Sequence, residues 1–248
     1  DRTAKRVTAQ SGRSVSYDKL LIATGSDPFI IPVPGKDLPG VISFRDMKDV
    51  DTMLAAAEAG KANGGGSAVV IGGGLLGLEA AAGLRLRGMD VTVIHLAPTL
   101  MERQLDPSAG YLLEKELANR GITILTGANT KEIYGDGKVD GVRLADGTEI
   151  PASLVVMAVG IRPNIEVGKL AGLEVGRGIK VNGVMQTSDP NIYSVGECVE
   201  FDGNCYGLVA PLFEQAQICA KVMTGQGKTE FSHSETATKL KVTGVDLY

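Results

Sequence analysis

The sequence predicts an α/β fold built on a parallel β-sheet. Residues 68–71 form a short apolar run, which is typical of a strand that is buried on both faces. A glycine-rich turn follows, and residues 75–87 are rich in helix-forming side chains. Residues 91–94 form a second apolar, β-branched run. The stretch 67–95 is therefore expected to fold as strand, turn, helix and strand.

Three glycines leave the first strand at G-x-G-x-x-G spacing, and inside such a unit this pattern is a dinucleotide fingerprint. Gly72 permits a tight turn, Gly74 lets the backbone approach a pyrophosphate, and Gly77 lets the helix pack close to the strand. The phosphates are expected on the free N–H groups of the helix N-terminus, around Leu75 and Leu76. The alternative is a flexible glycine turn that binds nothing.

His95 ends the second strand, 23 positions after Gly72 (95 − 72). A fingerprint for NAD has Asp or Glu there, bound to the ribose 2′-hydroxyl. Neutral imidazole can accept from that hydroxyl, whereas imidazolium favours a 2′-phosphate, for which Arg103 is a second candidate. The choice between NADH and NADPH stays open, with NADH slightly favoured because no Arg or Lys ends the strand. A solvent-facing histidine without function is an equal alternative.

Composition excludes several classes of protein. The 248 residues carry a net charge of −4, which gives no basic surface for nucleic acid or anionic membranes. The chain has no apolar run of about 18 residues and no signal peptide, so no membrane span is predicted. The three cysteines match neither a disulfide framework nor metal-ligand spacing. We therefore expect a cytoplasmic protein without a bound metal in this chain.

The segments before the fingerprint are predicted from turn and cap signals. Residues 5–17 suggest a hairpin, and residues 19–23 a buried strand. Four prolines make residues 26–47 an extended connector. A helix is expected over 46–62, with Asp46 as a possible N-cap.

The segments after the fingerprint follow similar signals. A helix is expected from Asp106 because proline occupies its first position. Residues 131–150 suggest a meander with glycine turns, and 154–159 a further buried strand. Pro211 is expected to open the last helix, and residues 236–245 show one more strand pattern.

Four motifs occur in order along the chain. They are LIATG at 21–25, G-x-G-x-x-G-x-E at 72–79, AVG-x-RPN at 158–164, and a Thr187-to-Glu197 stretch that ends in Y-x-x-GE. In this order they resemble the FAD- and NAD(P)-dependent pyridine nucleotide-disulfide oxidoreductase superfamily. Residues 41–45, 98–106, 195–198 and 206–211 look like the flavin-bearing front part of the large subunits of assimilatory NAD(P)H nitrite reductases.

The resemblance implies a Rossmann-like, three-layer NAD(P)-binding domain that is inserted into a partial FAD-binding domain. The expected parts are a first FAD segment at 1–47, the NAD(P) domain at 48–164, a second FAD segment at 165–228, and the start of an interface domain at 229–248. The fingerprint for the ADP half of FAD is absent, so the chain is expected to be an internal fragment. It should bind NAD(P)H weakly and hold no FAD by itself.

The resemblance also assigns residues. It places Glu79, which is expected on the first turn of the helix, near the nicotinamide and the flavin, although an acid at a helix N-terminus also complements the helix dipole. It implies close approach of the Gly160 backbone to the dinucleotide, rather than a simple turn. The implied flavin contacts are Thr24, Gly25, Arg45, Gly196 and Glu197. Arg45 is equally well explained as an exposed arginine before a helix.

The function implied by the resemblance is hydride transfer from NAD(P)H to FAD, with no catalytic side chain in this chain. Electrons then pass to siroheme and an iron–sulfur cluster outside it, and nitrite is reduced to ammonia. Expected partners are a small-molecule substrate, the rest of the polypeptide, a small subunit and a further copy of the chain. The alternatives are an NADH-dependent ferredoxin or rubredoxin reductase and a non-enzymatic dinucleotide-binding redox sensor.

Overall fold

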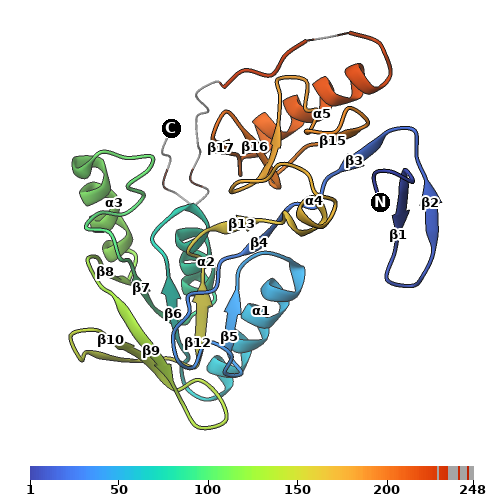
Figure 1. Cartoon of the computed structure of the whole chain (residues 1–248). Helices are drawn as coiled ribbons and strands as arrows, with labels where there is room; N and C mark the ends of the chain where they lie inside the picture. The colour runs from blue at the N-terminus through green and yellow to red at the C-terminus, as the bar shows by residue number, and fades with distance from the viewer. Residues whose placement is uncertain (228, 234–239, 241–244, 246–248) are drawn as a thin grey trace. The chain divides into compact units, whose positions relative to one another are not determined.

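The computed structural model describes residues 1–227, 229–233, 240 and 245, which fold as two compact units (Figure 1). Unit 1 comprises residues 1–27 and the described residues of 161–233, and unit 2 comprises residues 28–160 with Leu240 and Val245. Unit 2 is thus inserted into the sequence of unit 1, as expected for an inserted domain.

Unit 2 is organised by a five-stranded parallel sheet with strand order β5-β12-β6-β7-β8. The fingerprint strand lies at the centre of this sheet and is buried on both faces. The strands are β5 (Val41–Ser43), β6 (Ser67–Ile71), β7 (Asp90–Ile94), β8 (Ile122–Leu125) and β12 (Leu154–Met157).

Alternate strand residues supply two separate cores, because successive side chains of a strand point to opposite faces. Val70 and Val93 pack in a cluster with residues of three helices, which form one outer layer. Val69 and Ile71 pack in another cluster with residues of an antiparallel meander, which forms the other layer. The helices are α1 (Met47–Ala62), α2 (Leu75–Leu86) and α3 (Pro107–Asn119), and the meander strands are β9 (Thr130–Tyr134), β10 (Gly141–Leu144) and β11 (Glu149–Pro151). The three-layer prediction is confirmed.

The helix starts of unit 2 follow from capping chemistry. The Asp46 side chain accepts from the N–H of Asp49, and the Asp49 side chain accepts from the N–H of Asp46, so α1 begins with a reciprocal capping box. Asp106 caps α3 by accepting from Ala109 N–H at 2.8 Å, with proline next in the chain. Both predicted starts are therefore confirmed.

Unit 1 contains short strands in small sheets. β15 pairs with β3 in parallel, β14, β16 and β17 form a second sheet, and β1 and β2 form the expected hairpin. The strands are β1 (Arg6–Thr8), β2 (Ser14–Ser16), β3 (Leu20–Ile22), β4 (Ser26–Pro28), β13 (Ile161–Pro163), β14 (Ile179–Val181), β15 (Ile192–Ser194), β16 (Val199–Phe201) and β17 (Asn204–Cys205), with helices α4 (Glu166–Leu170) and α5 (Val209–Met223).

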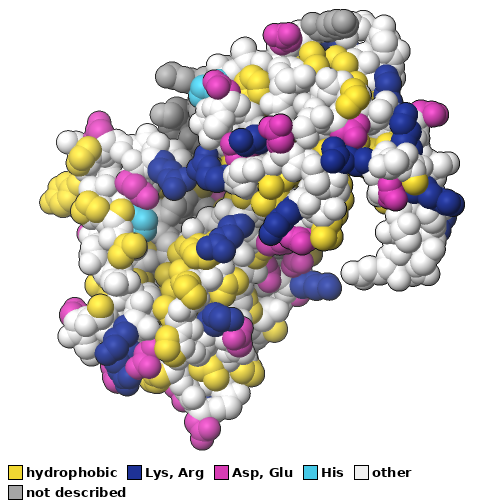
Figure 2. Space-filling view, viewed as in Figure 1, with side chains coloured by type: hydrophobic (Ala, Val, Ile, Leu, Met, Phe, Trp, Pro, Cys, Tyr) yellow, Lys and Arg dark blue, Asp and Glu magenta, His cyan; other side chains and the backbone are white. Residues whose placement is uncertain are grey.

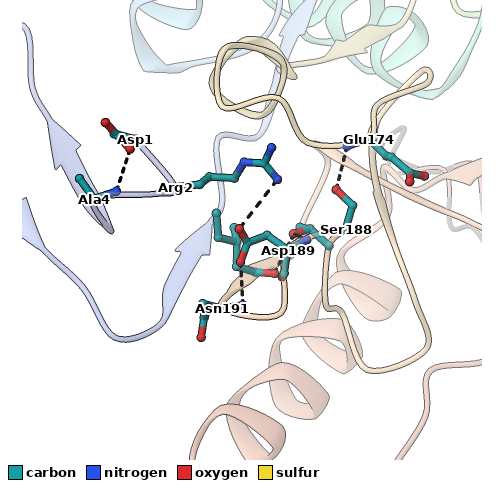
Figure 3. A network of polar contacts seen from close by, with 9 residues as sticks. Asp1, Arg2, Ala4, Glu174, Ser188, Asp189 and Asn191 are labelled. Atoms are coloured by element: carbon teal, nitrogen blue, oxygen red, sulfur yellow. Dashed lines mark hydrogen bonds and ion pairs between the residues drawn. The ribbon is translucent and has the colours of Figure 1, made fainter.

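A polar network joins the N-terminal hairpin to the turn before β15 (Figure 3). Arg2 Nη1 lies 3.8 Å from Asp189 Oδ2, and Asn191 N–H donates to Asp189 Oδ1 at 2.9 Å. Both ion-pair partners are partly exposed to solvent, so the pair adds little stability. The ion pair instead fixes position, because it links the first residues of unit 1 to the second sequence segment of that unit.

Some sequence expectations differ from the structure. Residues 28–47 belong to unit 2 and not to unit 1, because β5 pairs with β12 and the apolar residues after Pro28 join the second core cluster.

The last helix begins at Val209, two residues before Pro211, so this start was predicted too late. The pattern at 236–245 lies outside the described residues apart from Leu240 and Val245. The assignment of the units to FAD and NAD(P) stays a prediction.

Candidate dinucleotide and flavin sites

The predicted dinucleotide residues of unit 2 follow the carboxyl ends of neighbouring parallel strands. Gly72 follows β6, His95 follows β7, and Gly160 lies close after β12. Parallel strands end at one edge of a sheet, so the structure brings these three positions together at that edge. Ligands of open α/β sheets bind at this edge.

The fingerprint glycines differ in what surrounds them. Gly72 has φ +122°, and an added Cβ would lie 2.3 Å from Ala158 O. A Cβ on Gly77 would lie 1.9 Å from Gly72 O, so only glycine lets α2 pack against the turn. At Gly74 a Cβ meets nothing within 4 Å. At Gly72 and Gly77 the space for a side chain is filled by other atoms of the chain. Gly74 instead faces open space that a ligand can enter.

The N-terminus of α2 offers donors for an anion. Gly74 is its N-cap and supplies no side-chain bond, so the N–H groups of Leu75 and Leu76 lack a capping acceptor there. Gly160 has φ +107° and no neighbour within 4 Å of an added Cβ, so its backbone is also accessible. These residues fit a dinucleotide pyrophosphate.

His95 is held by two hydrogen bonds within unit 2. Gly73 N–H donates to His95 Nδ1 at 3.0 Å, and His95 Nε2 lies 3.0 Å from Glu102 Oε2. The His95 side chain is only 11% exposed. The alternative of a solvent-facing histidine is therefore wrong, because the ring packs against the glycine turn. Arg103 is exposed and has no hydrogen bond or ion pair with the described residues.

Glu79 is the fifth residue of α2, and the first turn of that helix contains no acid. The expectation of a first-turn acid is therefore wrong, because α2 begins at Leu75. Glu79 lines a cavity of about 200 Å³ between α1 and α2, together with Phe44, Met53 and Arg87. Its predicted place near the nicotinamide stays a prediction.

Arg45 follows β5 in unit 2, and its side chain is exposed. Its backbone N–H donates to Asp49 Oδ2 at 2.7 Å, so this residue belongs to the start of α1. The other predicted flavin contacts lie in unit 1. The flavin assignment of Arg45 stays a prediction.

The flavin candidates of unit 1 follow two neighbouring parallel strands. Thr24 and Gly25 follow β3, and Gly196 and Glu197 follow β15. Ser26 Oγ donates to Glu197 Oε2 at 2.8 Å, which joins the two turns directly. Gly25 and Gly196 have φ of +66° and +91°, and an added Cβ at either would meet nothing within 4 Å.

Sequence reasoning missed Gln215 of α5. Its side chain is fully buried, and Oε1 accepts from Gly196 N–H at 3.0 Å. Its Nε2 is buried without a hydrogen-bond partner among the described residues. An orphaned buried donor beside the Gly196 turn fits the idea that a polar group from elsewhere completes this site. No local pattern marks a glutamine 19 positions after the glycine (215 − 196) as its partner.

With this geometry in hand, comparison with known proteins identifies the family. The family model for pyridine nucleotide-disulphide oxidoreductases matches residues 1–226. The chain belongs to this family. Membership accounts for the inserted α/β unit and implies the use of FAD and NAD(P)H.

Within this family, the chain is similar to proteins of nitrite and nitrate reduction. The chain is 56% identical over its full 248 residues to a nitrite reductase [NAD(P)H] of Bacillus subtilis, and spans 30% of that protein. It is 46% identical, again over its full length, to the assimilatory nitrate reductase electron transfer subunit of the same organism, and spans 32% of it. The chain thus corresponds to about a third of these relatives.

A solved structure supports the fold. The ferredoxin reductase of Rhodopseudomonas palustris matches 94% of this chain at a TM-score of 0.86 and 32% identity, and the match covers 58% of that protein. In the part of the chain that the structure describes, no helix is long and apolar enough to cross a bilayer. Acidic and basic side chains are interspersed on the visible face (Figure 2).

Proposed function

We propose that this chain is the NAD(P)H-binding and flavin-reducing part of an assimilatory nitrite reductase. The 56% identity to the Bacillus subtilis nitrite reductase over the full chain carries the proposal. The open space at Gly74 and the uncapped start of α2 support dinucleotide binding. NADH is proposed as the preferred donor, and siroheme and the iron–sulfur cluster are proposed to lie in the rest of the polypeptide.

The protein's own contribution is binding and orientation. The backbone N–H groups at the start of α2 neutralise the pyrophosphate, and Glu197 supplies an acceptor for a ribityl hydroxyl of the flavin. NAD(P)H and FAD, when bound, supply the hydride-transfer chemistry. No side chain of this chain is assigned a proton-transfer step. The setting proposed is the cytoplasm, with a small subunit and further copies of the chain as partners.

Cofactor binding is tested first on this chain, by calorimetric titration with NADH and NADPH in parallel. Gly74→Ala should weaken NADH binding at least about tenfold, because the new methyl group occupies the approach of the pyrophosphate. Gly83→Ala is the matched control: it makes the same change in the same helix, again with no neighbour within 4 Å, and should leave affinity unchanged. Equal affinities of the wild type and Gly74→Ala would contradict the assigned site.

The nitrite assignment is tested on the longer polypeptide that carries this chain. We expect NADH oxidation that depends on nitrite and releases ammonium. Reduction of a ferredoxin or rubredoxin without any nitrite turnover would favour the second candidate, a ferredoxin-type reductase, which the fold similarity at a TM-score of 0.86 supports. Binding without sustained NADH oxidation by any acceptor would favour the redox sensor.

A further inference from the structure

The middle residue of the glycine turn, Gly73, is held by hydrogen bonds at both its N–H and its carbonyl group. Its N–H donates to His95 Nδ1 at 3.0 Å, and its carbonyl accepts from Met101 N–H at 3.0 Å. A Cβ on Gly73 would lie 2.6 Å from Leu100 Cδ2 and 2.8 Å from His95 Cγ. The segment between β7 and α3 is therefore fixed directly on the phosphate-binding turn (Figure 1).

The hydrogen bond from Gly73 sets the tautomer of His95. A ring nitrogen that accepts carries no proton, so Nδ1 has the lone pair and Nε2 has the hydrogen. That single N–H points to Glu102 Oε2 at 3.0 Å. Both ring nitrogens are then engaged within the chain, and neither is available to a ribose hydroxyl.

The carboxylate beside the ring is accessible to solvent. The Glu102 side chain is 42% exposed, against 11% for His95, and its Oε1 has no hydrogen bond with the described residues. Met101, next to it, is buried and has φ +52°, a left-handed conformation that is strained for a non-glycine residue. The strained turn and the bond from Met101 to Gly73 present Glu102 at the edge where the fingerprint places the ribose.

We infer that Glu102 is the acid that reads the 2′ position of the adenosine ribose, and that His95 is its positioning residue. The inference rests on the proposed function and refines it, since it supplies the acid that the end of β7 lacks. Oε1 accepts the 2′-hydroxyl of NADH. A 2′-phosphate would meet the same carboxylate with like charge, which disfavours NADPH. Arg103 follows Glu102 in the chain and is exposed. Its positive charge attracts a 2′-phosphate and so opposes the preference for NADH.

The test measures binding by calorimetry with three ligands: NADH, NADPH and NADH that lacks the 2′-hydroxyl on the adenosine ribose. The wild type should bind the deoxy ligand about tenfold more weakly than NADH. Glu102→Ala removes both carboxylate oxygens, so it should bind these two ligands alike, and the ratio of NADH to NADPH affinity should fall at least about tenfold. A general disturbance of the fold would weaken all three ligands together and leave the ratios unchanged.

Two further variants separate positioning from structure. His95→Asn keeps an acceptor near Gly73 but is too short to reach Glu102, so it should lower the affinity ratio without unfolding the chain, as checked by circular dichroism. Combined with Glu102→Ala it should lower the ratio no further, because both changes remove one interaction. Asp90→Asn is the matched control, since it removes a charge from the opposite end of β7 and should leave the ratio unchanged.

The outcomes distinguish the two proposals. If the wild type binds neither NADH nor NADPH, the proposed function fails. If it binds NADH but Glu102→Ala still discriminates against the deoxy ligand and NADPH, only the assignment of Glu102 fails.

Discussion

Cys198, Cys205 and Cys219 lie in unit 1 as free thiols. Cys219 is buried on α5 among apolar side chains, and this burial raises the pKa of its thiol to about 11, because the thiolate would be poorly solvated. Burial also raises the pKa of Cys205. Neither environment activates a thiol, since a reactive cysteine has a lowered pKa.

The raised pKa of Cys219 predicts a loss of stability at high pH. Below pH 9 the thiol is neutral in both states, and from about pH 9 to about pH 11 only the unfolded thiol ionises, which favours unfolding. Cys219→Ala should cost on the order of 1 kcal/mol at neutral pH, because a buried group is removed. The difference in the free energy of unfolding between this variant and the wild type should shrink as pH rises from about 9 to about 11.

Urea denaturation under reducing conditions, at several pH values between 7 and 11, measures both free energies of unfolding. A deficit that stays constant from neutral pH to about pH 11 would show that the Cys219 thiol does not titrate as its burial requires.

At the scale of the element, α2 is defined by how closely it packs against the turn that precedes it. Leu78 and Leu84 are fully buried, and Gly77 lies so close to Gly72 that a methyl group cannot be placed between them. The opposite face carries Gly83, where an added Cβ meets no neighbour. The same helix therefore contains one glycine that packing requires and another that it does not.

This contrast predicts opposite effects of one substitution. Gly77→Ala should lower the free energy of unfolding by about 1–3 kcal/mol, because the helix must move away from the turn. Gly83→Ala should raise it by about 0.5–1 kcal/mol, since alanine has the better helix propensity and nothing obstructs it. Chemical denaturation of the two variants beside the wild type checks both signs. If both Gly77→Ala and Gly83→Ala lower the free energy of unfolding, helix propensity does not decide the effect of alanine at position 83.

At the scale of the whole molecule, two units with separate cores share one chain. Unit 2 has two large clusters, one on each face of its sheet. Of the two clusters of unit 1, one contains residues of both sequence segments, and the other contains residues of the second segment alone. The candidate dinucleotide residues and Glu197, the proposed ribityl acceptor, are in different units. A ligand of the fingerprint should therefore act on unit 2 alone.

The ligand effect on unfolding tests this division. At a free NADH concentration of about 100 times its Kd, unit 2 should gain about 2.7 kcal/mol, because only the folded site binds. Differential scanning calorimetry should show one transition that moves to higher temperature with NADH and one that does not. A single transition that moves as a whole would show that the two units unfold together.

Much of the site could be predicted from sequence because its signals are local. The turn glycines, the cap at Asp46 and the buried strands follow from spacing and side-chain type within a few residues. The contacts of Glu102 and Gln215 could not be predicted, since packing brings Glu102 to His95 and Gln215 to the Gly196 turn. The boundary at 27/28 was missed for a similar reason, because the connector joins unit 2 through pairing between β5 and β12.

The sequence by itself determined that a glycine turn connects a strand and a helix, because glycine spacing and apolar runs encode short-range backbone geometry. Only the tertiary structure decided what surrounds the end of β7. There a histidine seven residues from Glu102 (102 − 95) uses both ring nitrogens within the chain. The physical reason is that hydrogen-bond partners and tautomers depend on three-dimensional proximity, which residue spacing does not specify.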